Sequence, residues 1–551
     1  MPRFSRLLWI PFLVVGVGLF HHWRQSRPSR VAQADEAGIL LIGNGTDIES
    51  LDPHMATGQP EHHVITTLFE GLVAPAADDP DADAPGVATH WQSADFITWT
   101  FHLREDALWS DGTPLTSADF LYSWQRILSP ALASDYAPML YLMKNAQAYN
   151  EGRLTDFAEV GAIAPDAHTL VITLEGPAPF FPSLLKHYTW FPVPRHGVEK
   201  FGTMTQRDTA WARPGNLIGN GPFLLQDWRI NHFISVTRNP RYWDAANVGL
   251  NGIRFFPIDN AESEERLFLD NQLHVTNSVP LAKIAVYRRE RPTYFHQSPE
   301  LSVEFYRCNT TRPPLNDERV RNALALALDR RALVEDVIRS GSLPATSLTP
   351  PGSSPDYPPL QLISYDPEKA RQFLAQAGFP GGRGFRKIEI LTNSSESART
   401  IAEFFQESWK RELGLEISIL QQEWQVYLDS TRKLTYDIAR AGWVGDYTDP
   451  YTFLGIWRKG DGNNNTGWNS PAYDALLDAS TQEAETSRRM ATLRQAETLL
   501  MQQMPIIPVY WKTNSELIRP EVENWKPSVI SHRCYKALRL GPYQPLPPRR
   551  P

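Results

Sequence analysis

Cysteine is almost absent from this chain, and its scarcity excludes two kinds of structure. The 551 residues include only Cys308 and Cys534, and no Cys-x-x-Cys spacing occurs. A thiolate zinc site and a fold held by several disulfides are therefore excluded, although one bridge between the two cysteines stays open. No cysteine lies near the amino terminus, so the residue through which lipoproteins are anchored is missing.

A sustained run of lysine and arginine is also missing. The chain holds 54 basic and 62 acidic side chains, which give a formal net charge of -8. A nucleic-acid-binding surface needs basic residues clustered on one face. We therefore expect no nucleic-acid partner, and a ligand of neutral or mixed charge.

Motifs of common catalytic sites are missing as well. The chain has no GxSxG elbow, no HExxH pair, no Walker loop and no GxGxxG that follows a strand. We expect a protein that is not an enzyme, with no metal site and no cofactor. The 62 acidic residues leave a glycosidase-like carboxylate pair open, so a secreted hydrolase is the alternative from another class.

Two polar clusters have simple structural explanations. The adjacent His62 and His63 would point in different directions on any regular backbone, which favours a solvated loop over metal ligation. The run from Asn463 to Asn465 favours a turn, because asparagine tolerates left-handed backbone and bonds to its own main chain.

The chain is long and rich in aromatic residues. A chain of 551 residues and 62.5 kDa is too long for one hydrophobic core, which predicts two or three domains with interleaved connectivity. Its 17 Trp and 25 Phe exceed what core packing alone demands. We therefore expect a binding space lined by aromatic side chains.

The amino-terminal segment has the charge order of an export signal. Arg3 and Arg6 precede an apolar run from Leu7 to Phe20, which is typical of a signal peptide and short for a bilayer span. The small-residue site at 32–34 lies farther downstream than signal peptidase usually accepts. We expect an exported protein of the periplasm or cell envelope, with residues 1–35 forming a cleaved signal peptide or a retained anchor.

From Ile39 onward, short apolar runs alternate with amphipathic helical patterns and Pro/Gly punctuation, which predicts mixed α/β domains. The strands we expect include Trp99–Leu103, Leu170–Leu174, Ile234–Arg238, Ile253–Pro257 and Leu415–Leu420. Helices are expected from Asp317 to Gly341, from Asp366 to Gly378 and from Ile401 to Gly414. Residues 74–85 are expected to form a surface loop, and residues 542–551 a frayed tail.

Nine segments follow one another along the chain in an order that is typical of one protein family. They are ESLDPH from Glu49, LFEGL from Leu68, WTFHLREDALWSDGTPLTSADFLYSWQRIL from Trp99, NGPFLLQDW from Asn220, RNPRYWD from Arg238, RPPLNDERVRNALALALDR from Arg312, ATSLTPPG from Ala345, RAGWVGDYTDPYTFL from Arg440 and IIPVYW from Ile506. This series resembles the oligopeptide-binding proteins of ABC importers, in the extracellular solute-binding protein family 5.

The resemblance implies an α/β fold with two lobes, of the periplasmic-binding-protein type (class II), and an extra domain inserted in the first lobe. By analogy, the divisions are 36–73 with 200–303 and 514–541 for lobe I, 74–199 for the inserted domain, 304–513 for lobe II and 542–551 for the tail. Two strand crossings near Glu304 and Tyr510 would form the hinge around which the lobes close.

The resemblance also implies a function. A monomer of this family captures a short peptide by lobe closure and delivers it to the membrane permease of an ABC importer. The peptide main chain would bond to exposed strand edges that match Thr57 to Gln59 and Gly442 to Val444, where Gly442 allows a close approach.

The charged ends of a peptide need counterions once closure removes their water. Asp446 matches the family's partner for the ammonium group, and Arg440 and Arg432 match its partners for the carboxylate. A third family cation, a histidine, is replaced by Ala398, which leaves the preferred peptide length open. Aromatic walls are expected from Trp424, Trp443, Tyr122 and Tyr510.

Alternatives within binding functions stay open. The same fold family includes binders of nickel chelates, haem and sugars, and a membrane-anchored sensor would use the same fold. Asp446 favours a ligand with an α-amino group over a sugar or a metal.

Overall fold

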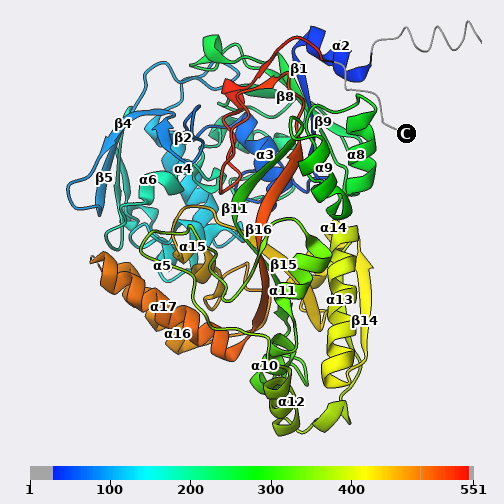
Figure 1. Cartoon of the computed structure of the whole chain (residues 1–551). Coiled ribbons are helices and arrows are strands. Elements are labelled where there is room, and N and C mark those ends of the chain that lie inside the picture. Colours follow the sequence, from blue (N-terminus) through cyan, green and yellow to red (C-terminus); the bar gives the residue numbers. More distant parts are fainter. Residues whose placement is uncertain (1–28, 484, 545–551) are drawn as a thin grey trace, which may run out of the picture.

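The structure is a computed structural model that describes residues 29–483 and 485–544, apart from the side chain of Glu396 (Figure 1). Of the leader or anchor segment expected at residues 1–35, residues 1–28 lie outside the described residues, whereas residues 30–35 belong to helix α2 (Arg30–Ala37), in which Val31 and Ala34 are buried. Strands and helices alternate along the chain, which confirms the expected mixed α/β class. Two large hydrophobic cores form, one mainly from residues 40–275 with 518–538, and one mainly from residues 301–511; Tyr447 belongs to the first core and Tyr136 to the second.

The helices include both exposed and buried elements, and all four residues of α6 (Phe181–Leu184) are buried. They are α2 (Arg30–Ala37), α3 (Gln59–Leu68), α4 (Ser117–Leu128), α5 (Ala146–Asn150), α6 (Phe181–Leu184), α7 (Arg195–Glu199), α8 (Ala261–Leu269), α9 (Ile284–Glu290), α10 (Glu318–Leu326), α11 (Arg330–Ala332), α12 (Pro367–Gln376), α13 (Glu396–Leu413), α14 (Trp424–Arg432), α15 (Tyr451–Leu454), α16 (Pro471–Gln482) and α17 (Thr486–Gln503). None of the helices in the described ranges is long and apolar enough to cross a membrane.

Two four-stranded sheets belong to the first core. One has the order β1-β10-β9-β8, with β1 (Ile39–Gly43), β8 (Phe223–Arg229), β9 (Phe233–Arg238) and β10 (Gly252–Phe256). The other has the order β4-β5-β7-β6, with β4 (Ala88–Gln92), β5 (Thr98–Leu103), β6 (Ala162–Asp166) and β7 (Thr169–Thr173). The expected strands at 99–103, 170–174, 234–238 and 253–257 are confirmed within one residue at each end.

The second core is built on a six-stranded sheet with the order β12-β16-β11-β15-β13-β14. Its strands are β11 (Phe295–Cys308), β12 (Leu343–Pro344), β13 (Ile388–Asn393), β14 (Ile417–Gln422), β15 (Ile438–Val444) and β16 (Ile506–Leu517). Short pairs β2 (Val73–Pro75) with β3 (Asp83–Pro85) and β17 (Val522–Glu523) with β18 (Arg539–Leu540) complete the strands described.

Two long strands connect the two cores. β11 and β16 pair antiparallel from Phe295 opposite Leu517 to Arg307 opposite Ile506, and they run side by side through the middle of the molecule (Figure 1). The register shifts between Pro299 and Val303, and again after Glu304. Proline has no N–H for the ladder, and a bulge bends a strand. The ladder is therefore weakest where the chain passes between the cores.

Helix boundaries follow local capping signals. Asp366 accepts from the Lys369 N–H and Pro367 occupies the first turn of α12, while Gly414 ends α13 in the left-handed conformation at φ 70°. Helix α12 confirms the expectation, and α13 confirms the expected end at Gly414 but starts earlier, at Glu396. The single helix expected from 317 to 341 is wrong, because α10 ends at Leu326 and Asp329 caps a new start at α11.

Residues 74–85 differ from the expected loop. β2 and β3 form a small hairpin, and Asp81 beside it bonds to the Ser528 hydroxyl at 2.5 Å and the Val529 N–H at 2.9 Å. The Asp81 carboxylate accepts both hydrogen bonds and so fixes the carboxy-terminal segment of the chain at residues 528–529. The two cysteines, Cys308 and Cys534, are both buried free thiols, and burial raises the pKa of Cys308 to about 12.

Candidate functional site

A cavity of about 910 Å³ lies between the two cores. Ten of the residues predicted for binding line it: Thr57, Gln59, Trp424, Arg432, Arg440, Gly442, Trp443, Val444, Asp446 and Tyr510. Contacts across the cavity hold its walls together. The ring centroids of Tyr136 and Trp443 lie 6.2 Å apart, and Phe180 stacks on Tyr447 with ring centroids 5.3 Å apart. The structure therefore shows the cavity with its walls closed on each other.

One edge of β15 is open toward the cavity. On one side, β15 pairs with β11 over its whole length. On the other side, it pairs with β13 only at Ile438 and Ala439. The residues after Ala439 therefore have main-chain groups that no strand of the described chain occupies.

The direction of these free groups can be read from one contact. The Tyr427 hydroxyl donates to the main-chain oxygen of Arg440 on the open side of β15. Because main-chain groups point to the same side at every second residue of a strand, Gly442 and Val444 direct theirs to the same edge. This edge can accept one more strand.

The second expected strand edge has a different structure. Thr57 to Gln59 does line the cavity, but Gly58 is the N-cap of α3 and Gln59 is its first residue. Gly58 is extended, with φ -102° and ψ 155°. The segment therefore offers a short extended stretch and not a strand, because Pro60 in the first turn starts the helix at this point.

Asp446 lies just beyond the open edge of β15, and within residues 29–483 and 485–544 its carboxylate has no cationic partner. Its neighbours are the Thr452 hydroxyl at 3.3 Å and His187 Nε2 at 3.4 Å. Burial raises the pKa of the Asp446 carboxyl to about 8, and burial keeps the pKa of His187 well below its usual value. The pair is therefore not ionic near neutral pH, and a cation placed here would restore the carboxylate.

Three histidines from distant parts of the chain form part of the cavity wall. His62 stacks with His532 at 5.4 Å and with His187 at 6.2 Å between ring centroids. The expected solvated loop is wrong, because His62 and His63 are buried on α3. Burial lowers the pKa of His62 to about 4, so these rings are neutral at pH 7. No local signal could reveal this cluster, because its members are far apart in sequence.

Arg440 is already bound by an acid of its own chain. Its Nη2 lies 2.7 Å from Oε2 of Glu304, and its Nε also donates to that carboxylate. Lys512 Nζ lies 3.1 Å from the same oxygen, and Glu304 is fully buried. The triad holds one surplus positive charge. Sequence reasoning missed Glu304 as a partner because the two residues are on different strands.

Arg432 forms a looser set of contacts. It lies 3.5 Å from Glu49 and 3.6 Å from Asp135, both on the other side of the cavity, and 35% of its side chain is exposed. Exposed pairs of this kind contribute little to stability. Arg432 can therefore exchange partners with a ligand at small cost.

The aromatic predictions divide into two groups. Trp443, Trp424 and Tyr510 line the cavity, and Trp424 stacks on Tyr427 at 5.5 Å. The placement of Tyr122 needs correction, because it is buried in the first core on α4, with Arg195 5.7 Å from its ring, and it does not line the cavity. Its place in the best-matched segment reflects packing of α4.

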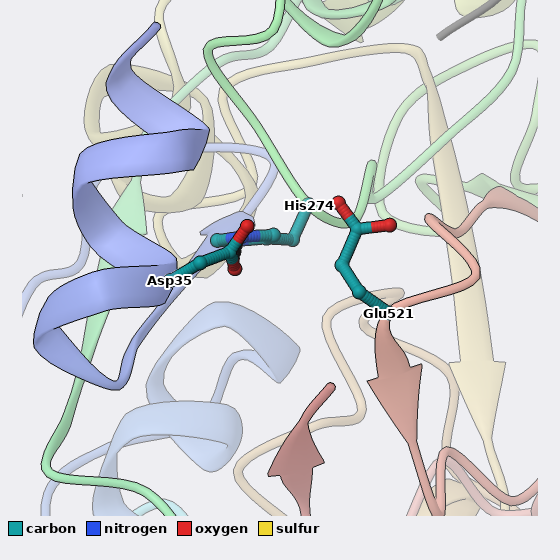
Figure 2. Close-up of side chains that lie close together, drawn as sticks. All are labelled: Asp35, His274 and Glu521. Carbon is teal, nitrogen blue, oxygen red and sulfur yellow. Dashed lines mark hydrogen bonds and ion pairs between the residues drawn. The ribbon is translucent and has the colours of Figure 1, made fainter. Parts of the chain in front are cut away.

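One triple of potential metal ligands occurs among the described residues, and none of the three lines the cavity. Asp35, His274 and Glu521 offer atoms within 4.8 Å of one another (Figure 2). His274 Nδ1 accepts the Leu41 N–H at 2.9 Å, so its Nε2 carries the proton and donates to Asp35 at 2.8 Å. A protonated Nε2 has no lone pair for a metal. The contact instead docks α2 on the first lobe.

The amino-acid sequence is similar to those of known solute-binding proteins. The family described as "Bacterial extracellular solute-binding proteins, family 5 Middle" matches residues 84–465. The periplasmic oligopeptide-binding protein OppA of Salmonella typhimurium is 37% identical over 503 residues, covering 90% of this chain and 91% of that protein. The periplasmic murein peptide-binding protein MppA of Escherichia coli is 38% identical over 483 residues, covering 86% and 88%.

Solved structures agree with these matches. A structure of the Escherichia coli murein tripeptide-binding protein MppA has a TM-score of 0.86 at 35% identity, covering 91% of this chain and 98% of that chain. Haemophilus influenzae OppA in complex with RPPGFSPFR also has 0.86, at 31% identity and covering 92% and 99%. The unliganded open form of MppA reaches only 0.62 at 36% identity, covering 92% and 98%. The lobes of this chain are therefore not in that open arrangement.

Proposed function

This chain belongs to family 5 of the bacterial extracellular solute-binding proteins, and we propose that it captures short peptides by closing its two lobes and delivers them to the membrane permease of an ABC importer. Its two-lobed α/β fold is that of the periplasmic peptide-binding proteins. The relatives named above bind oligopeptides or murein peptides, and this chain retains a cavity with an open strand edge.

The observation that carries the proposal is Asp446. A carboxylate buried without a counterion is strongly unfavourable. Its place just past the open edge of β15 is where the ammonium end of an added peptide strand would lie. The three neutral histidines nearby do not compete for the negative charge. We therefore assign Asp446 as the anchor of the peptide amino terminus.

The edge of β15 and the extended segment at Thr57 to Gln59 would bond to the peptide main chain from two sides. Main-chain bonds do not depend on peptide sequence, so this mode accepts varied peptides. Closure would use the weak ladder region of β11 and β16 as its hinge, near Glu304 and Tyr510.

Three further properties belong to this proposal. The protein is exported to the periplasm, in keeping with its relatives and with the signal-like run at residues 7–20. It acts as a monomer, and it has no chemistry of its own. A turnover assay with peptide and glycoside substrates tests the last statement, because a secreted hydrolase would release products.

The decisive test is calorimetric titration of the full chain with a tripeptide and with its N-acetylated form. We expect the free-amino peptide to bind at least a hundredfold more tightly, because acetylation removes the ammonium that pairs with Asp446. Equal binding of both forms would falsify the anchor. Mass spectrometry of ligands retained by the purified protein should independently show peptides of narrow length and mixed sequence.

A further inference from the structure

Arg307 is a buried cation in the cavity wall that has no acidic partner. It lines the cavity from β11 with only 8% of its surface exposed. Its Nη2 donates to the main-chain oxygen of Asn463 at 3.3 Å, while its Nε is buried and has no hydrogen-bond partner. Among the described residues, no carboxylate forms an ion pair with it.

The other cations that line the cavity differ from Arg307 in this respect. Arg440 and Lys512 share Glu304, and Arg533 pairs with Glu516 at 2.6 Å. Arg432 contacts acids across the cavity, and Arg339 is exposed to solvent. Of the cations that line the cavity in the described part of the chain, Arg307 alone combines burial with an unpaired charge, which is costly unless a counterion arrives from outside the chain.

The groups around Arg307 are neutral. Tyr427 and Tyr436 are close enough for its charge to act on their pKa values, but their hydroxyls already donate to main-chain oxygens of Arg440 and Asn465. Hydroxyl and amide groups cannot balance a guanidinium charge. The missing partner is therefore an anion.

The strand register shows which part of a ligand would reach Arg307. Arg307 is opposite Ala439 on β15, and Val303, four residues earlier, is opposite Trp443. Paired residues and every second residue along a strand project to one face. Arg307, Ala441 and Trp443 therefore share a face, and all three line the cavity.

A ligand strand on that edge alternates its side chains between the two faces. Its main chain continues along the edge, toward Arg440 and the Tyr427 contact, whereas a side chain on the Trp443 face points toward Arg307. A carboxylate matches the planar fork of arginine. We propose that Arg307 binds a side-chain carboxylate of the peptide, so that this protein prefers peptides with an acidic residue at one interior position.

This inference rests on the proposed peptide-binding function, and the test separates the two. The full chain is titrated with tri- and tetra-alanine peptides in which each interior position in turn is glutamate or glutamine. Each peptide is made with a carboxylate and with an amide at its carboxyl end. We expect the glutamate form to bind at least tenfold more tightly than the glutamine form at one position.

Two variants assign that preference. Arg307→Gln should reduce it below twofold while binding the glutamine peptides as the wild type does, and Arg307→Lys should keep part of it. The comparison within the wild type stays informative even if a variant folds poorly. Equal binding of glutamate and glutamine peptides at every position overturns the inference and leaves the proposed function intact.

Two other outcomes are also decisive. If Arg307→Gln weakens only peptides with a free carboxyl end, Arg307 binds the peptide terminus and the side-chain assignment is wrong. If no peptide with a free amino end binds at all, the proposed function itself fails.

Discussion

Asp446 and Glu304 are buried carboxylates that lie at or beside the same strand, β15, but they have different partners. Glu304 accepts from Arg440 and Lys512, and these charges hold its pKa below the usual range. Among the described residues, the polar side chains in contact with the Asp446 carboxylate are the Thr452 hydroxyl and the neutral His187 imidazole, and burial raises the pKa of Asp446 to about 8. Glu304, whose charge is balanced within the chain, stabilises the sheet. Asp446 lacks such a partner and is available to a cationic group of a ligand.

Substitution of Asp446 should reduce peptide affinity more than any other substitution considered below. Asp446→Ala should weaken binding of a free-amino tripeptide by a hundredfold to several thousandfold, because removing one member of a desolvated pair costs about 3 to 5 kcal/mol. Calorimetric titration measures the loss. Stability toward urea should stay the same or rise, because the variant removes a buried carboxyl without a counterion. A large loss of stability with unchanged affinity would reverse the roles of the two carboxylates.

Glu304→Gln should show the opposite pattern. Two cations would lose their shared acid in a buried site, which we expect to lower the free energy of unfolding by about 3 kcal/mol. The urea midpoint measures this change. Affinity for a neutral tripeptide should change by less than about tenfold, or about 1.4 kcal/mol. A variant as stable as the wild type would show that the triad is not structural.

Lobe closure without ligand should depend on pH through Asp446. A solvated aspartate has a pKa of about 3.9, and burial in the closed cavity raises the pKa of Asp446 to about 8. A raised carboxyl pKa opposes closure more strongly as pH rises toward 8, so closure without ligand becomes easier as pH falls from 8 to 6.5. The free energy of closure can change by at most about 1.4 kcal/mol per pH unit through this one group. Below pH 6.5, protonation of His62, whose pKa burial lowers to about 4, acts against closure.

Small-angle scattering of the ligand-free chain measures this effect as a decrease in the radius of gyration between pH 8 and pH 6.5. Asp446→Asn is the matched control, because it cannot lose a proton and should be equally compact at both values. Identical behaviour of the wild type and the variant would show that Asp446 does not control empty closure.

The smallest effects are expected at Arg432 and Tyr122. Arg432 is partly exposed and its contacts are long, so Arg432→Gln should change stability by at most about 1 kcal/mol, as measured by thermal unfolding.

Tyr122→Phe should leave peptide affinity unchanged, because its buried hydroxyl has no partner and its ring does not line the cavity. A tenfold loss of affinity in Tyr122→Phe would contradict its assignment to the core.

Local signals in the sequence were enough to predict much of the fold. The alternation of short strands with capped helices indicated the α/β class, and Asp366 and Gly414 marked boundaries of α12 and α13 that the structure confirms. Resemblance to one protein family led to eleven predicted binding residues, and ten of them line the same cavity. Caps, turns and motifs act within a few residues, so they can be read without the fold.

The partners of the charged and aromatic groups depend on the tertiary structure and could not be predicted from the sequence. Arg440 was predicted as a ligand contact, but it meets Glu304, which is 136 positions away in sequence. The stacked His62, His187 and His532, the core placement of Tyr122 and the unpaired Arg307 arise in the same way. The sequence determined which ionisable groups the chain carries. Which of them meet an opposite charge depends on distances through space, and those exist only after the strands have paired and the lobes have come together.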